Sequence, residues 1–343
     1  MSLHNLLSQI KLIDNVNDIA AYKAVVANSY EWLDSALGNS EVTELVLGRA
    51  TFVDALLKHV WQLMGLQNEP QLTLVAVGGY GRGQLQPHSD IDLLLLSKKL
   101  LSNKQQEHIS QFITLLWDIG LDVGQSVRTI SETFLLAKQD VTIATNLVEA
   151  RLLDGCEKTF ASLQQKLCSR GYWSSKDFFL AKEQEQKQRH RKFKDTSYNL
   201  EPNVKESPGC LRDIQSIGWI AKKHFNATDG KDLLEHGYFN QQEFDELIEC
   251  REKLWRIRFA LHIVAGRSEN RLLFDYQTDV ADRLGYGHEG KASVERMMKA
   301  FFRIVRRISE LNKMLIQRFS HDVLSLKVIQ QTKIDKDFEL LDG

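Results

Sequence analysis

The stretch that decides the fold is Leu72–Leu96, which reads LTLVAVGGYGRGQLQPHSDIDLLLL. It begins with an apolar run over residues 72–77, which is typical of a buried strand. Four glycines then interrupt the pattern between residues 78 and 83, and we expect a turn there. After Pro87 the chain returns to an apolar run over residues 91–96, which predicts a second strand.

Two carboxylates stand at the entry to this second strand, Asp90 and Asp92. Side chains alternate along a strand, so we expect both on one face, roughly 7 Å apart. Two such carboxylates in front of a glycine turn can bind a divalent ion and, through it, a triphosphate. A dinucleotide fingerprint requires a helix directly after the glycines, where we expect a strand, and a Walker A loop requires a Gly-Lys-Ser/Thr string that is missing here. From the residues alone, a plain hairpin remains the alternative.

Composition narrows the class of protein. A chain of 343 residues with 43% hydrophobic and 26% charged residues has the size of two or three globular domains. Its 44 Lys and Arg against 45 Asp and Glu disfavour a nucleic-acid partner and favour a protein or small-molecule substrate. The 4 cysteines lack CxxC spacing, which indicates reduced thiols in a cytoplasmic protein. We expect no membrane segment, since no apolar run approaches about 20 residues, and no signal peptide.

Most of the remaining chain has helical periodicity. Apolar residues at helical spacing over residues 17–37 and 41–64 predict N-terminal helices that pack on the sheet. Another predicted helix starts at Ser102 and ends at Gly120, and residues 121–130 alternate like a strand. Two strands, a helix and a further strand indicate a small mixed sheet with helices on one face.

The second half of the chain is predicted to be helical. Residues 131–170 have a helical pattern with short breaks, and long helices are expected from Ser174 and over residues 242–266 and 293–320. The expected fold class is therefore α+β, with a helical N-terminal segment, a small sheet and a C-terminal helical bundle. Three polar residues in the first of these segments could face a nucleotide, but such residues more often cap or solvate a helix, so we assign no role to Asn146, Glu149 and Arg151.

Three further features of the sequence are considered as possible binding or metal sites. The first is a basic cluster on the helix expected from Ser174, which is either a solvated helix face or a surface that attracts a triphosphate or an acidic partner. Its members are Lys187, Arg189, His190, Arg191, Lys192 and Lys194. The segment at residues 196–221 is a loop leading into a helix, which suits phosphate or base contact, or is a structured connector. The pair His321–Asp322 stands alone, so we interpret it as chance and not as a phosphohydrolase metal site.

Several of these strings resemble one family. GGYGRGQLQPHSDIDLLLL, over residues 78–96, is similar to the active-site motif of the bacterial PII uridylyltransferases, the bifunctional uridylyltransferase/uridylyl-removing enzymes, and has the arrangement of nucleotidyltransferases built like DNA polymerase β. The strings at residues 48–61, 145–155 and 266–286 also resemble that family. So does TSYNLEPNVKESPGCLRDIQSIGWIA at residues 196–221, and a related pattern occurs in glutamine synthetase adenylyltransferases.

The resemblance implies a polymerase-β-like nucleotidyltransferase that moves UMP from UTP to a tyrosine of the PII protein and releases pyrophosphate. It implies two Mg²⁺ ions held by three catalytic, metal-binding carboxylates: Asp90, Asp92 and Asp122. Asp122 stands where the family motif carries Asp or Glu. The expected nucleotide-binding residues are Gly78, Gly79, Arg82, Ser89, Asn203, Lys205, Arg212 and Asp213. Two alternatives stay open, an adenylyltransferase acting on a protein such as glutamine synthetase and an inactive nucleotide-sensing module.

The expected domain organisation follows the same resemblance. We expect a helical segment at residues 1–64, a catalytic core at 65–138, a helical nucleotide- and substrate-binding domain at 139–320, and a linker at 321–343. In the family this linker leads to an HD phosphohydrolase domain, which we expect to be absent, so uridylyl-removing activity is not expected of this chain.

Overall fold

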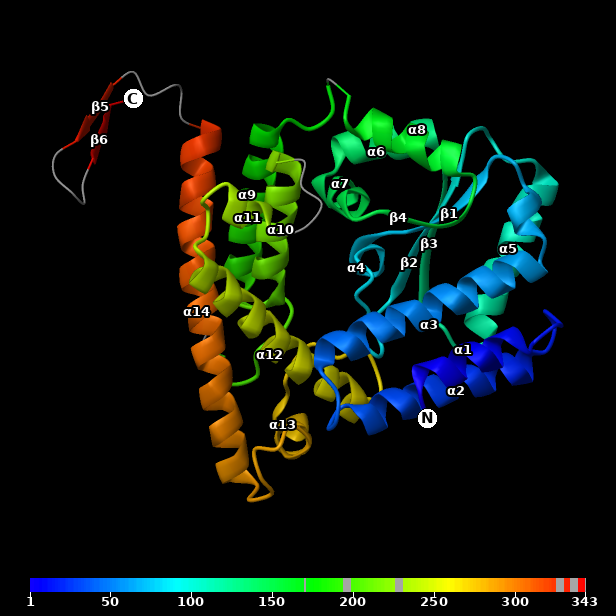
Figure 1. The fold of residues 1–343 in the computed structure, drawn as a ribbon, viewed down its shortest axis with the longest axis horizontal. Coiled ribbons are helices and arrows are strands. Elements are labelled where there is room, and N and C mark those ends of the chain that lie inside the picture. Colours follow the sequence, from blue (N-terminus) through cyan, green and yellow to red (C-terminus); the bar gives the residue numbers. More distant parts are fainter. Residues whose placement is uncertain (170, 194–198, 226–230, 325–329, 334–338, 343) are drawn as a thin grey trace. The chain divides into compact units, whose positions relative to one another are not determined.

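The computed structural model describes residues 1–169, 171–193, 199–225, 231–324, 330–333 and 339–342 (Figure 1). Lys194 of the basic cluster, residues 196–198 and part of the expected linker lie outside the described residues. The chain divides into two compact units, which we describe separately. Unit 1 comprises Met1–Tyr172, Asn199–Lys205 and Glu252–Phe301, and unit 2 comprises Trp173–Tyr198, Glu206–Arg251 and Phe302–Gly343. The domain boundaries expected at residues 64, 138 and 320 stay a prediction.

Unit 1 contains the sheet and the helices around it. Its elements are α1 (Leu3–Lys11), α2 (Ile19–Ala36), α3 (Val42–Leu63), η1 (Leu66–Asn68), β1 (Leu72–Ala76), α4 (Gly78–Gly81), β2 (Ile91–Ser97), α5 (Asn103–Asp118), β3 (Val123–Thr129), α6 (Ile130–Gln139), α7 (Val141–Val148), β4 (Arg151–Gly155), α8 (Glu157–Leu167) and α13 (Phe274–Arg283). Unit 2 contains α9 (Ser175–Lys192), α10 (Leu211–Phe225), α11 (Asp232–Glu235), β5 (Gln330–Lys333) and β6 (Glu339–Asp342). Both units receive residues from α12 (Gln241–Ala265) and α14 (Lys291–Leu324). The predicted α+β class is confirmed.

The sheet of unit 1 has the strand order β3-β2-β1-β4. β1 is antiparallel to both β2 and β4, whereas β2 and β3 are parallel, so the sheet is mixed as predicted. Parallel neighbours require a crossover, and α5 supplies it. This helix begins at a capping box, in which Ser102 and Gln105 exchange hydrogen bonds between side chain and backbone. The three strands predicted from residues 72 to 130 are confirmed, with ends shifted by one or two residues.

The fourth strand was missed. Residues 131–170 were expected to be helical throughout, yet β4 pairs with β1, with Ala76 opposite Arg151 and Thr73 opposite Gly155. A strand of five residues with only two adjacent leucines has too short an apolar pattern to be distinguished from a helix end. Pairing with an edge of the sheet decides its conformation, and that pairing joins residues about 80 positions apart in the sequence.

The glycine stretch also differs from expectation, because it forms a single helical turn, α4, and not a simple turn between strands. Gly78 has a left-handed φ of 57°, which a residue with a side chain rarely adopts. At Gly81 a Cβ atom would stand 2.2 Å from the carbonyl oxygen of Glu149 and 3.0 Å from that of Ala76. The glycines therefore allow the chain to turn tightly against the segment that leads into β4.

Helices cover both faces of the sheet, where the sequence had suggested one face. On one face Val75, Leu94 and Leu96 form a core with buried side chains of α6, α7 and α8. On the other face lie α3 and α5, whose Trp61 and Phe112 rings meet edge to face at 5.2 Å (Figure 1). The second layer was not recognised because the amphipathic pattern of a helix shows that it is buried on one side but not which face of a sheet it meets.

Unit 2 is a helical assembly around one apolar cluster. Buried residues of α9, α10, α12 and α14 meet there, among them Phe179, Ile217, Leu247, Leu315 and Phe319. β5 and β6 pair antiparallel with each other. Throughout the described part of the chain, no helix is long and apolar enough to cross a membrane.

We expect Gly81→Ala to lower the free energy of unfolding by about 1–3 kcal/mol, the usual cost of forcing extra volume into a packed interior. Urea denaturation followed by circular dichroism measures the loss. Gly218→Ala in α10 is the matched control, because its Cβ position has nothing within 4 Å. Alanine is preferred to glycine within helices by about 1 kcal/mol, so this control should equal or exceed the wild type in stability. A Gly81→Ala protein as stable as the wild type would contradict the close backbone approach.

Candidate active site

Three aspartates come together at the ends of two parallel strands. Asp90 directly precedes β2, Asp122 directly precedes β3, and Ile91 lies opposite Val123 in the register. The backbone N–H of Ile91 donates to the carbonyl oxygen of Asp122 at 2.9 Å, which holds the two strand ends side by side. Asp92 lies in β2, two residues after Asp90, and the charges of Asp90 and Asp122 both act on it. Asp90 and Asp122 are exposed, and Asp92 is half-buried.

The charges of this group act on one another. Burial raises the pKa of Asp92 to about 6, and the nearby carboxylates of Asp90 and Asp122 add to the increase. The cationic Lys205 acts in the opposite direction. The site therefore concentrates negative charge around a partly buried carboxylate, with one lysine close enough to offset part of it.

Glycines make room for the Asp92 carboxylate on two sides. A Cβ atom at Gly78 would lie 3.1 Å from its Oδ2 atom, and one at Gly124 would lie 2.9 Å from its Oδ1 atom. The side-chain oxygen of Asn146, in α7, stands 3.5 Å from the same Cβ position of Gly78. Asn146 was one of three polar residues that could face a nucleotide but were assigned no role from the sequence. Asn146 therefore joins the candidate site.

Two arginine–carboxylate pairs support the helical turn α4. Arg82, expected to contact phosphate, forms an ion pair with the buried Glu149 and donates to Gln84 at 3.1 Å. Arg151 donates to both oxygens of Asp54 in α3, at 2.6 and 3.0 Å. The Tyr80 hydroxyl also donates to Asp54, at 2.6 Å. These contacts hold the turn from two sides. At Gly79, the other nucleotide-binding candidate in this turn, a Cβ atom would lie 3.5 Å from the Arg82 guanidinium.

The loop before Asp90 is held by residues from the unit 1 part of α12. Arg258 donates to the Ser89 hydroxyl at 3.3 Å and to the side-chain oxygen of Asn270 at 2.7 Å. The His88 backbone N–H donates to Nδ1 of His262 at 3.3 Å. Burial, followed by the charge of Arg258, lowers the pKa of His262 to about 2, so this ring is neutral and can accept. Sequence reasoning missed both residues, since nothing in a helical pattern indicates which loop the helix supports.

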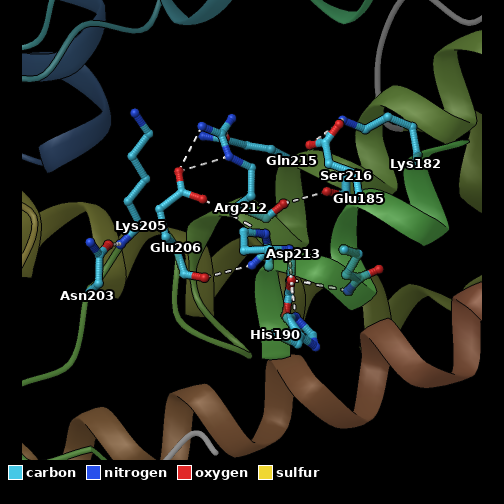
Figure 2. A network of polar contacts seen from close by, with 12 residues as sticks. Lys182, Glu185, His190, Asn203, Lys205, Glu206, Arg212, Asp213, Gln215 and Ser216 are labelled. Atoms are coloured by element: carbon cyan, nitrogen blue, oxygen red, sulfur yellow. Dashed lines mark hydrogen bonds and ion pairs between the residues drawn. The ribbon is translucent and has the colours of Figure 1, made fainter. Parts of the chain in front are cut away.

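Asn203 and Lys205 lie in unit 1 together with the aspartates. The Asn203 side-chain oxygen accepts from the Lys205 backbone N–H at 3.0 Å, which forms a tight local turn (Figure 2). Val204 donates to the Asn270 carbonyl oxygen at 2.8 Å, and Asn203 forms a β-bridge with Arg271. These contacts hold the segment close enough to Asp92 for the charge of Lys205 to lower the pKa of that carboxyl.

Arg212 and Asp213 lie in unit 2. Asp213 is fully buried and accepts hydrogen bonds from the side chains of Gln186 and Arg189 and from the backbone N–H of Gly209. His190 also donates to it, at 3.0 Å (Figure 2). Burial alone would raise its pKa, but the hydrogen bond from His190 and the charge of Arg189 lower it. Arg212 pairs with Glu206 at 2.9 Å and lies over the Trp219 ring. Arg189 and His190 of the basic cluster therefore bind a buried carboxylate inside unit 2. Direct nucleotide contact by Asp213 stays a prediction.

The carboxylates of this group are the kind of ligand that Mg²⁺ prefers. Within the described residues, no three His, Cys, Asp or Glu side chains lie close enough together to hold a metal ion unaided. Mg²⁺ does not need such a cage, because one or two carboxylates usually bind it together with water and substrate phosphates. Burial first, and the charges of Asp90 and Asp122 after it, raise the pKa of Asp92, and a cation bound there would stabilise its ionised form.

Comparison with known proteins agrees with this geometry. Residues 65–146 match the family described as nucleotidyltransferase domain, and residues 177–316 match GlnD PII-uridylyltransferase. Among curated proteins, the bifunctional uridylyltransferase/uridylyl-removing enzyme of Idiomarina loihiensis is 50% identical over 321 residues, which are 92% of this chain and 36% of the relative. The enzyme of that name from Pseudoalteromonas translucida is 48% identical over 332 residues, 96% of this chain and 38% of the relative. The chain thus spans little more than a third of the length of these relatives.

Asp92→Asn is expected to be more stable than the wild type at pH 7.5 in metal-free buffer. The folded-state pKa of Asp92 is raised from 3.8 to about 6, so its contribution to stability is full below pH 3.8 and is lost as the pH rises through about 6. We expect a gain on the order of 1 kcal/mol, because partial exposure screens the charges. Urea denaturation at pH 7.5 and at pH 3.5 measures it. The gain should vanish at the lower pH, and Asp14→Asn on an exposed loop should give none at either.

Asp213→Asn is expected to destabilise unit 2 by about 3 kcal/mol or more, because it leaves the buried Arg189 without its close counter-charge. The measurement is the thermal unfolding midpoint of the whole chain. Asp245→Asn, an exposed position near the start of α12, is the control and should shift the midpoint little. Equal midpoints for both variants would mean that the Asp213 contacts contribute nothing to stability.

Proposed function

Because this chain belongs to the family of bifunctional uridylyltransferase/uridylyl-removing enzymes, we propose that it transfers UMP from UTP to a tyrosine of a PII nitrogen-regulatory protein and releases pyrophosphate. The observation that carries this proposal is the meeting of Asp90, Asp92 and Asp122 at the paired ends of β2 and β3, beside the glycine turn. A cytoplasmic location is part of the proposal.

The carboxylates have distinct roles in this reaction. Asp90 and Asp92 would hold two Mg²⁺ ions, with Asp122 as the third carboxylate. When bound, magnesium neutralises the charge of the triphosphate and lowers the pKa of the incoming hydroxyl. Gly78 and Gly79 let the phosphates approach the backbone of α4 closely, since no side chain covers it there.

The acceptor needs help to react at neutral pH, because a tyrosine hydroxyl has a pKa near 10. Its oxygen forms a bond to the α-phosphorus while the bond from that phosphorus to the bridging oxygen breaks, and pyrophosphate leaves. We assign acceptance of the phenolic proton to Asp122, which is exposed at the strand end. Arg82 and Ser89 are the phosphate partners, and each is oriented by a neighbour, Glu149 or Arg258.

Nucleotide binding involves the second motif in this proposal. Lys205 supports it best, because its charge already acts on Asp92. Asn203 and Arg212 are assigned to the nucleotide as well, and Asp213 holds the loop ahead of α10 through its buried hydrogen bonds. The experiment therefore compares UTP with ATP to determine which nucleotide base the site accepts.

The test is the intact mass of a PII protein after incubation with this chain, Mg²⁺ and either UTP or ATP. We expect a gain of one uridylyl group per subunit with UTP alone. Asp92→Asn should lose this activity by several orders of magnitude, about the loss expected for removal of a metal ligand from the reacting centre. Asp14→Asn is the control and should retain it.

Each other outcome has a definite meaning. A mass gain with ATP in place of UTP would support an adenylyltransferase. No gain with either nucleotide, or an active and folded Asp92→Asn protein, would refute the proposed reaction or its site.

A further inference from the structure

A pocket of about 290 Å³ lies beside Asp92, bounded by β2, β3, α6 and α7 of unit 1. Asp92 and Gly124 line one end of it. Ser126 and Arg128 follow on β3, on the same face of the sheet as Gly124, because strand side chains alternate. Ile143 and Asn146 of α7 line the side opposite the sheet. The pocket thus shares Asp92 with the carboxylate group and extends from it along β3.

The size and lining of the pocket fit one aromatic ring better than a nucleotide. Sites for whole small molecules range from about 300 to 1,000 Å³, so this pocket is at the lower limit of that range. Its walls combine aliphatic side chains, such as Leu94 and Ile143, with a few polar ones. Such a lining suits a phenol, whose ring is apolar and whose hydroxyl needs a polar partner.

The position of the pocket on the sheet indicates from which side an acceptor would approach Asp92. The strand order β3-β2-β1 puts Gly124, Ser126 and Arg128 of the pocket on β3, whereas the glycine turn follows β1 and meets the pocket only at its Val77 edge. In phosphoryl transfer the attacking and leaving oxygens are roughly in line. If the triphosphate occupies the glycine turn, the acceptor must enter from the β3 side, and this pocket is on that side. Asn146 lines the pocket and also lies 3.5 Å from the Cβ position of Gly78.

Arg128 provides a charge at the outer end of the pocket. It lies four residues from Gly124 along β3, roughly 13 Å at the rise of a strand. Among the described residues its guanidinium has no hydrogen bond or ion pair, although the charge of Glu132 is near enough to interact. That Glu132 carboxylate is already bonded to the backbone and side chain of Thr129. Arg128 is therefore a half-buried cation available to a ligand.

We propose that this pocket is the acceptor subsite of the transferase. It takes the ring of the acceptor tyrosine between β3 and α7, with the hydroxyl directed to Asp92 and Asp122. Arg128 binds a carboxylate or a backbone carbonyl oxygen of the acceptor chain next to that tyrosine. This inference rests on the proposed function and adds to it which surface selects the protein substrate.

The experiment compares two tryptophan variants on adjacent positions of one strand. Ser126→Trp fills the pocket, whereas Val127→Trp projects from the opposite face of β3, where Val127 is already 41% exposed. Steady-state uridylylation is measured with PII protein varied at saturating UTP, and with UTP varied at saturating PII. Ser126→Trp should lower kcat/KM for PII about a hundredfold, the scale of a misplaced reactant, and leave the KM for UTP unchanged. Val127→Trp should match the wild type in both.

A second pair of variants tests the charge without filling space. Arg128→Ala should raise the KM for PII about tenfold or more, the usual effect of losing a charge-assisted hydrogen bond, with kcat and the KM for UTP little changed. Arg128→Lys, which retains the charge, should recover part of that loss. Circular dichroism of each variant establishes that it is folded.

The outcomes separate the two proposals. Parallel increases in the KM for UTP in Ser126→Trp and Arg128→Ala would mean that the pocket holds the nucleotide, and would overturn the inference while the transferase activity stands. Unchanged kinetics for PII in both folded variants would overturn it equally. A wild-type chain that transfers no nucleotide would overturn both proposals, because no acceptor would then exist.

Discussion

The parallel pairing of β2 with β3 is the constraint on which the rest of unit 1 depends. It sets Ile91 opposite Val123 and joins the two strand ends through the hydrogen bond from Ile91 to Asp122. Because parallel neighbours have the same faces in register, the residues just before and just inside the strands share one side. A slip of one residue would turn Asp92 toward the apolar layer of α3 and α5. The crossover helix α5 and the cores on both faces hold that register.

Bringing carboxylates together has an energetic cost, which the surrounding structure offsets. Asp92 is partly buried among like charges, so its ionised form is disfavoured in the absence of a cation. The elements around it are held rigidly by pairs of opposite charge, Arg82 with Glu149 and Arg151 with Asp54. A preformed but electrostatically unfavourable cluster suits a site that gains its counter-charge only when metal and nucleotide arrive.

The second motif illustrates how one continuous string can serve two separate bodies. Its first part, with Asn203 and Lys205, belongs to unit 1, and its last part, with Arg212 and Asp213, belongs to unit 2. Asp213 has a side chain that could bind a ligand, but its carboxylate already accepts hydrogen bonds from Arg189, His190 and two further donors. Such a buried, fully bonded acid orients the loop ahead of α10, from whose Gly209 backbone N–H it accepts a hydrogen bond.

Sequence patterns alone determined the local part of this protein: the first three strands, the helix that starts at Ser102, and the shared face of Asp90 and Asp92. These follow from periods of 2 and 3.6 residues and from capping chemistry, which act over a few neighbouring positions. Tertiary structure alone decided the strand β4, the second helical layer, and the positions of Asn146, Arg258 and His262 beside the site. Each of these depends on partners that are distant in the sequence, and His88 and His262 are 174 positions apart. No local pattern encodes such a pairing, because it is selected by packing of the whole unit.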